Sequence, residues 1–283
     1  MYYLESSQLR LAVHGPADGF YLGTRFDRSG VLDSLQLGGK EICGRWFEHY
    51  HPRMHDAVCG PAEEFTAIGY RPGGHFLKIG VGVLRADDAP YDRFHLYEME
   101  DPGEWTVVQR EASLEFCHRL KGLYEYHKTL ELSGENRFEI RHELLAFQPL
   151  EGQVYNHNFF TMGRMEVGPG RKLDFPFTPA GTWRALYDSV AFKENGVRFS
   201  RRLEPGESVF SGDIHESGKV GMPYSLRLTD RDISVQISGN VPVTHTVLWA
   251  NHRIACLEPY NFFSSTPESP FSWRVQYELF KNT

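Results

Sequence analysis

The stretch Trp273-Arg-Val-Gln-Tyr-Glu-Leu279, near the end of the chain, carries the pattern that decides the fold class. Its apolar residues alternate with polar ones, so a β-strand would place Trp273, Val275, Tyr277 and Leu279 on one face. The same period of two recurs in residues 8–13, 138–144 and 233–237. Each of these segments therefore predicts a strand that buries one face and exposes the other.

Outside these segments, aromatic residues and turn signals dominate. The chain of 283 residues contains 20 Phe, 14 Tyr, 27 Gly and 16 Pro, and turn dipeptides such as Asn195-Gly196 and Pro205-Gly206 recur along it. The one helical segment that we expect is a short turn over Pro61-Ala-Glu-Glu-Phe65, with its proline placed early. No linker or internal repeat interrupts the pattern. We therefore predict an all-β protein with few or no helices, forming one domain over residues 1–283.

Charge and cysteine usage exclude several classes of protein. Lys and Arg number 30 against 37 Asp and Glu, a net charge of −7, which predicts no nucleic-acid partner. No apolar run reaches the roughly 18 residues of a membrane span, and residues 1–5 lack the layout of a signal peptide. The four cysteines form no CxxC pair, so we expect neither disulfides nor a structural zinc site, and a cytoplasmic location. They are Cys43, Cys59, Cys117 and Cys256.

Two segments depart from simple alternation and offer acid–base chemistry. In Val154-Tyr-Asn-His-Asn-Phe-Phe160, His157 stands between two asparagines whose amides can fix the tautomer of its ring. In Ile254-Ala-Cys-Leu-Glu-Pro-Tyr260, Glu258 follows an apolar run, and burial there would raise its pKa toward that of a useful general base. The alternatives are a hydrogen-bonded histidine inside a sheet and a strand-end carboxylate that reaches water.

A third region combines carboxylates with a lysine in an apolar, glycine-rich run. It comprises Cys59-Gly-Pro-Ala-Glu-Glu-Phe65 and Gly73-Gly-His-Phe-Leu-Lys-Ile-Gly-Val-Gly-Val83. The run lacks the GxxxxGK[ST] pattern of a phosphate loop, so a nucleotide site is not expected. Lys78 is either a solvated lysine on a strand face or a cation inside a cleft.

Taken in order, these segments resemble the galactose mutarotase-like superfamily of aldose 1-epimerases. Asn156-His-Asn-Phe-Phe160 is similar to the family's Asn-His-x-Tyr-Phe element, and Cys256-Leu-Glu-Pro259 to its Cys-Leu-Glu-Pro element. Residues 23–39 resemble its opening hairpin, and residues 266–279 its last turn and strand, so the resemblance covers nearly the whole chain. It implies an antiparallel β-supersandwich with a sugar lying across the concave face of one sheet.

The resemblance also implies an isomerase that opens and recloses a sugar ring without metal or cofactor. Glu258 would take the proton of the anomeric hydroxyl, and His157 would protonate the ring oxygen. The Asn-Arg and His-Gly-Gly elements of the family's N-terminal half are missing here. By position, the expected sugar contacts are Lys78, the weaker candidates Glu64 and His75, Asp213 of Ser211-Gly-Asp-Ile214, and Asn156 beside the histidine.

Three functions remain open. The first is an aldose 1-epimerase acting on a free hexose or related sugar, which would be its small-molecule partner. The second is a hexose-6-phosphate 1-epimerase, for which Arg53, Arg71 and Lys78 are possible phosphate contacts. The third is a non-catalytic carbohydrate-binding protein of the same fold, against which the presence of both His157 and Glu258 argues, because a binder needs no acid–base pair.

Overall fold

β-Strands make up nearly all the regular structure of this chain. The computed structural model describes residues 1–164, 166–185, 188–219 and 221–282. Within these ranges the one helical element is a single 3-10 turn, η1 (Pro16–Asp18). None of the described helical structure is long and apolar enough to cross a membrane. The predicted all-β class is therefore confirmed.

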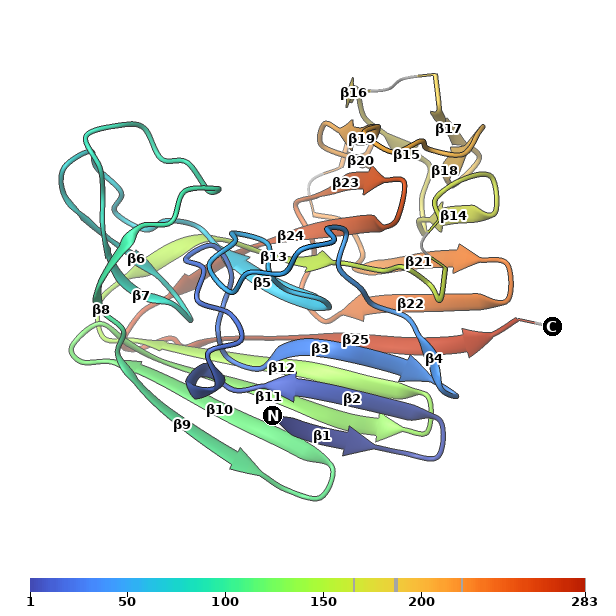
Figure 1. The fold of residues 1–283 in the computed structure, drawn as a ribbon. Helices are drawn as coiled ribbons and strands as arrows, with labels where there is room; N and C mark the ends of the chain where they lie inside the picture. Colours follow the sequence, from blue (N-terminus) through green and yellow to red (C-terminus); the bar gives the residue numbers. More distant parts are fainter. Residues whose placement is uncertain (165, 186–187, 220, 283) are drawn as a thin grey trace.

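The largest sheet has ten strands and extends from the upper right of Figure 1 down to the base of the molecule. All of its pairings are antiparallel. In spatial order its strands are β17 (Val190–Lys193), β18 (Gly196–Phe199), β14 (Arg171–Asp174), β21 (Ser225–Asp230), β22 (Ile233–Gly239), β25 (Phe271–Lys281), β12 (Arg137–Ala146), β11 (Tyr124–Gly134), β10 (Ser113–Leu120) and β9 (Glu104–Gln109).

A second, six-stranded sheet holds both acid–base segments, and smaller sheets surround it. Its strands in spatial order are β16 (Trp183–Ala185), β19 (Ser208–Ser211), β23 (His245–Asn251), β24 (Ala255–Ser265), β13 (Leu150–Asn158) and β5 (Pro61–Phe65). One smaller sheet consists of β1 (Tyr2–Glu5), β2 (Leu9–His14), β3 (Val31–Leu37) and β4 (Lys40–Glu41). Another consists of β6 (His75–Lys78), β7 (Gly82–Arg85) and β8 (Glu98–Asp101), and β15 (Pro179–Ala180) pairs with β20 (His215–Glu216).

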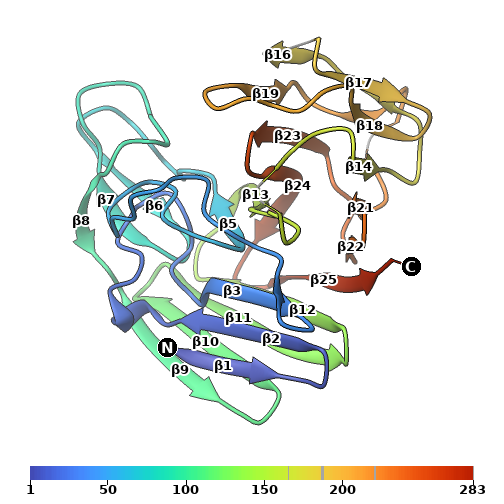
Figure 2. The ribbon, with the colours of Figure 1, turned by 45° about the vertical axis from the view of Figure 1, so that its right-hand side comes forward.

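The alternation seen in the sequence builds the core between these layers. Trp273, Val275, Tyr277 and Leu279 of β25 are all buried, as their spacing predicts. Phe65 of β5 packs edge-on against Trp273 at 6.0 Å, which joins the six-stranded sheet to the ten-stranded one. In both ribbon views β1–β3 lie beside β10–β12 (Figures 1 and 2). Leu11 and Leu35 of β2 and β3 share one buried apolar cluster with residues of β10–β12.

The helical turn expected over residues 61–65 is wrong, because this segment is strand β5 with all five residues buried. Pro61 lies where a proline is tolerated in a sheet, at the first residue of an edge strand. The two glutamates point to opposite faces of the sheet, since consecutive strand residues do. Glu63 faces the core between the sheets, and Glu64 faces the other way, so each carboxylate needs its own partners.

Glu63 finds those partners inside the core. Its carboxylate pairs with Lys128 of β11 and accepts hydrogen bonds from His142 Nε2 at 3.1 Å and Asn156 Nδ2 at 3.0 Å. Lys128 Nζ also lies 3.4 Å from Asp27 Oδ2. Burial alone would raise the pKa of Glu63, but Lys128 and His142 lower it to about 2. The carboxylate is therefore charged, and it ties β5, β11, β12 and β13 together.

We predict that Glu63→Gln destabilises the protein by about 3 kcal/mol or more, because it leaves Lys128 charged in the core with a weakened set of partners. Urea unfolding followed by fluorescence measures the change. Glu115→Gln is the matched control, since Glu115 forms an exposed ion pair with Arg110 on the outer face of β10 and its loss should change stability little. Equal effects of the two substitutions would contradict this account of the core.

Candidate active site

Strands β13 and β24 bring together two residues that are far apart in the sequence. Tyr155 pairs with Tyr260 in the antiparallel register, so two residues further along the same face His157 lies opposite Glu258. The distance from His157 Nε2 to Glu258 Oε1 is 3.2 Å. Both residues are only 4% exposed. The sheet register thus creates a buried acid–base pair in close contact from the two segments that the sequence singled out.

Aromatic rings hold the imidazole in place. The ring of His157 stacks on Phe159 at 4.0 Å and meets the edges of Phe26 at 5.7 Å and Trp249 at 6.1 Å. Within the described part of the chain, His157 Nδ1 has no hydrogen-bond partner. The asparagine amides therefore do not fix the tautomer as the sequence suggested, and the one polar contact of the ring is made through Nε2 with Glu258.

Burial shifts the two pKa values in opposite directions. Burial raises the pKa of Glu258 to about 7, with the Glu64 carboxylate adding to the rise and Arg25 and Arg93 opposing it. Burial, with the positive charges of Arg25 and Arg93, lowers the pKa of His157 well below its usual value. Near neutral pH the pair therefore holds at most one titratable proton, and this proton lies mainly on Glu258.

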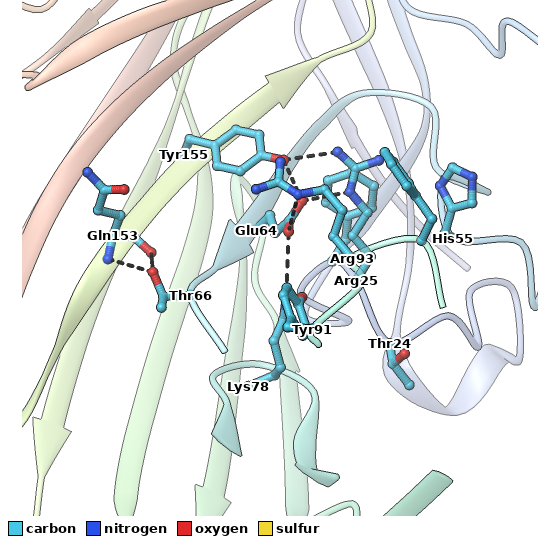
Figure 3. A network of polar contacts seen from close by, with 12 residues as sticks. Thr24, Arg25, His55, Glu64, Thr66, Lys78, Tyr91, Arg93, Gln153 and Tyr155 are labelled. Atoms are coloured by element: carbon cyan, nitrogen blue, oxygen red, sulfur yellow. Dashed lines mark hydrogen bonds and ion pairs between the residues drawn. The ribbon is translucent and has the colours of Figure 1, made fainter. Parts of the chain in front are cut away.

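On the same face of the sheet, Glu64 gathers a group of cations that Figure 3 shows from close by. Arg25 Nε lies 2.6 Å from its Oε2, while Lys78 Nζ and Arg93 Nε each lie 3.7 Å from its Oε1. The Tyr155 hydroxyl donates a further hydrogen bond to the carboxylate. Three cations thus converge on one carboxylate.

The pKa values of this group follow from burial and mutual charge. Burial alone would raise the pKa of Glu64, but Arg25, Lys78 and Arg93 together lower it to about 2. Burial lowers the pKa of Lys78 to about 8, with the attraction of Glu64 opposing the shift. At neutral pH most Lys78 side chains are still charged, so the group carries an excess of positive charge close to Glu258.

A cavity of about 250 Å³ opens beside the acid–base pair. Tyr155 and Tyr260, whose rings stack at 4.3 Å, both line it, together with the half-exposed Arg93. The lining residues are Glu64, Phe65, Thr66, Ala67, Tyr70, Tyr91, Arg93, Gln153, Tyr155 and Tyr260. His157 and Glu258 are not part of this lining but lie beside it along their strands, two residues from Tyr155 and Tyr260 respectively. The cavity offers phenol rings, hydroxyls and a guanidinium, which suit a polar ring-shaped ligand.

The other residues expected at the site lie at varied distances from the pair. Glu64 and Lys78 lie in the cation group, with Lys78 fully buried and donating to the Tyr91 hydroxyl at 3.3 Å. Lys78 is thus the cation inside the fold and not the solvated lysine. Asn156 faces the core on the opposite side of β13, where it binds Glu63. The remaining two expected residues are His75 and the exposed Asp213. His75 has Glu100 as its charged partner, and Asp213 has His245.

Sequence reasoning missed several side chains that surround the pair. Arg25 comes from the loop between β2 and β3, and Arg93 from the loop between β7 and β8. Arg25 pairs with Glu64 and also donates to the Tyr155 hydroxyl at 3.0 Å. The sequence contained a signal only for Tyr155, which lies two residues before His157 and therefore on the same face of β13. It contained none for Arg25 or Arg93, because loop residues carry no periodicity.

The described residues hold one group of three possible metal ligands, and it lies elsewhere in the fold. Cys117, Glu125 and His127 cluster on β10 and β11, away from the acid–base pair. The contacts found for His157 and Glu258 are with each other, with aromatic rings and with Tyr260. These groups are suited to moving protons between a ligand and the protein.

Comparison with solved structures identifies the fold. The chain matches no protein-family model and no curated protein by sequence. Among solved structures, a candidate aldose 1-epimerase from Escherichia coli K12 is 13% identical, with a TM-score of 0.64 over 99% of both chains. An aldose epimerase homologue from C. elegans is 14% identical, with a TM-score of 0.60 over 100% of this chain and 99% of that one.

A third solved structure, galactose 1-epimerase from Lactobacillus acidophilus NCFM, is 9% identical, with a TM-score of 0.51 over 98% of this chain and 92% of that one. At such identities the likeness establishes the architecture. This chain has the galactose mutarotase-like fold, and the resemblance seen in its sequence is confirmed at that level.

Proposed function

We propose that this protein is an aldose 1-epimerase that interconverts the α and β anomers of a hexose or a related sugar. The observation that carries the proposal is the buried contact of 3.2 Å between His157 Nε2 and Glu258 Oε1, beside a cavity walled by tyrosines. The galactose mutarotase-like fold supports it, although a shared fold alone does not assign an activity.

In the proposed reaction the two groups act on two oxygens bonded to the same sugar carbon. With the pair's single proton on Nε2, anionic Glu258 removes the proton of the anomeric hydroxyl while His157 protonates the ring oxygen. The ring opens to the aldehyde, the bond next to it rotates, and the reverse transfers close the other anomer. Each proton transfer of this kind accelerates a reaction by about 10²–10⁴-fold.

The raised pKa of Glu258, about 7, suits this role because a general base works best near the operating pH. The pKa of His157 is lowered, whereas a general acid near neutral pH would ordinarily use an imidazole of unshifted pKa. A lower pKa makes the imidazolium of His157 a stronger acid, provided that Glu258 first transfers its proton to His157. Transfer across the existing contact as the sugar binds supplies that proton without any group from solvent.

A second candidate function has its own supporting observation. The cation group of Arg25, Lys78 and Arg93 carries more positive charge than Glu64 neutralises, and Arg93 lines the cavity. A guanidinium binds phosphate oxygens well. A hexose 6-phosphate is therefore the alternative substrate, with its phosphate at Arg93 in place of the contacts at Arg53 and Arg71 that the sequence suggested.

Loss of either member of the pair should abolish the activity. We predict that Glu258→Gln and His157→Gln each lower kcat by at least about 10²-fold while retaining the fold. Polarimetry of freshly dissolved α-D-glucose and α-D-galactose measures the rate above the spontaneous one, and circular dichroism checks the fold. Glu143→Gln, on the exposed outer face of β12, is the control with unchanged rate. Near-normal turnover by Glu258→Gln would exclude the proposed base, and no acceleration by the unaltered protein would favour a sugar-binding protein.

The pair also predicts an unusual pH profile. Activity requires one proton on the pair, so kcat/KM should fall on the alkaline side near pH 7, where Glu258 loses its proton. On the acid side it should fall only well below the usual range of histidine, because the pKa of His157 is lowered. Glu64→Gln should move the alkaline limb to lower pH, since the Glu64 charge raises the pKa of Glu258. Activity that keeps rising well above neutral pH would contradict this.

The two candidate substrates can be separated at Arg93. If the substrate is phosphorylated, Arg93→Met raises KM for glucose 6-phosphate by at least about tenfold, as expected for the loss of a charged contact of about 1.5–3 kcal/mol, and leaves KM for glucose unchanged. Steady-state polarimetry with both sugars measures the two values. Equal KM values for the two sugars in the unaltered protein would eliminate the phosphorylated candidate.

A further inference from the structure

A second cluster of reactive side chains lies on the ten-stranded sheet, away from the acid–base pair. Cys117 of β10 stands directly opposite His127 of β11 in the antiparallel register. Glu125 lies two residues before His127 and therefore on the same face of β11. The ligand atoms of these three residues all lie within 4.8 Å of one another. In Figure 1, β10 and β11 occupy the lower part of the molecule, below the strands that carry His157 and Glu258.

The face that carries the cluster is open to solvent. Along β10 the residues alternate between buried and half-buried, and Cys117 belongs to the half-buried set. His127 and Glu125 alternate in the same way with the buried tyrosines of β11. The other three cysteines, Cys43, Cys59 and Cys256, are buried in the described structure. Cys117 is thus a thiol that ions and reagents can reach.

We propose that Cys117, His127 and Glu125 form a binding site for a zinc-type divalent cation. A thiolate, an imidazole and a carboxylate are the three ligand types that Zn²⁺ takes in proteins, and three protein ligands with one open position is a common zinc geometry. The thiolate and imidazole do not suit Mg²⁺ or Ca²⁺, which take oxygen ligands. One thiolate and one carboxylate would balance the charge of the cation.

A neighbouring residue already orients one of the three ligands. Glu125 Oε2 is held by Arg119 Nη2 at 2.7 Å, which leaves Oε1 directed toward the ring of His127. The present contact of 2.8 Å between that oxygen and His127 Nε2 is where the cation would insert. Second contacts of this kind fix metal ligands in place. Two adjacent strands also supply a rigid frame, which a loop would not.

We expect the chain to bind one Zn²⁺, and we expect this binding to require ligands from both β10 and β11. Isothermal titration of the chelator-treated full chain with Zn²⁺ measures affinity and stoichiometry. Cys117→Ser and His127→Gln should each weaken binding by at least about tenfold, since even the loss of a supporting contact costs about that much. Glu115→Gln is the matched control, because Glu115 lies on the same face of β10 two residues from Cys117, and it should leave binding unchanged.

A second measurement uses the unaltered protein and needs no variant to fold. Co²⁺ in place of Zn²⁺ should produce a thiolate-to-metal charge-transfer band, and Zn²⁺ should slow the reaction of Cys117 with a thiol reagent. Absence of the band and of the protection would overturn the site. Zinc affinity that is the same in Cys117→Ser, His127→Gln and the control would overturn it as well, by showing that the cation binds elsewhere. Because neither readout involves the sugar reaction, the result stands independently of the proposed function.

Discussion

The arrangement of this molecule depends on two consecutive buried glutamates on one edge strand. Glu63 and Glu64 of β5 are 0% and 3% exposed, and a strand sends them to opposite faces of its sheet. A buried carboxylate is stable only when it is paired and hydrogen-bonded. Glu63 therefore requires Lys128 and His142 from the ten-stranded sheet, and Glu64 requires Arg25 and cations from two further segments. The first requirement fixes how the sheets pack, and the second fixes the loops above the site.

The same constraint explains why two carboxylates on one sheet face behave differently. Glu64 is surrounded by cations, and its pKa lies near 2. Glu258 lies 3.2 Å from His157, whose own pKa is lowered, and the pKa of Glu258 lies near 7. When two environments shift the pKa values of two carboxylates in opposite directions, one carboxylate serves as a structural charge and the other as a reactive group. Because Glu64 and Arg25 act on Glu258 with opposite signs, the cation group also tunes the proposed base.

How much of this could be predicted from the sequence depends on whether a residue lies in a strand or a loop. Alternation correctly predicted the strands of residues 138–144 and 273–279, and two short motifs identified His157 and Glu258, which the register of β13 and β24 then brought together. Residues 61–65 were assigned to a helical turn because the partners that make Glu63 and Glu64 stable in a strand are distant in sequence. Arg93 had no local signal, since its place depends on a loop closing over Tyr155.

Burial of the acid–base pair has two consequences that act against each other. Desolvation gives Glu258 its raised pKa, yet at 4% exposure neither Glu258 nor His157 is open to a sugar. A substrate must therefore pass through the adjoining cavity and replace the contact between the two side chains with its own oxygens. The side chain best placed to admit it is Arg93, which is 39% exposed and comes from a loop rather than from the sheet. Because the charge of Arg93 lowers the pKa of Glu258, movement of Arg93 away from Tyr155 would both open the cavity and raise the pKa of the proposed base, without disturbing the strands.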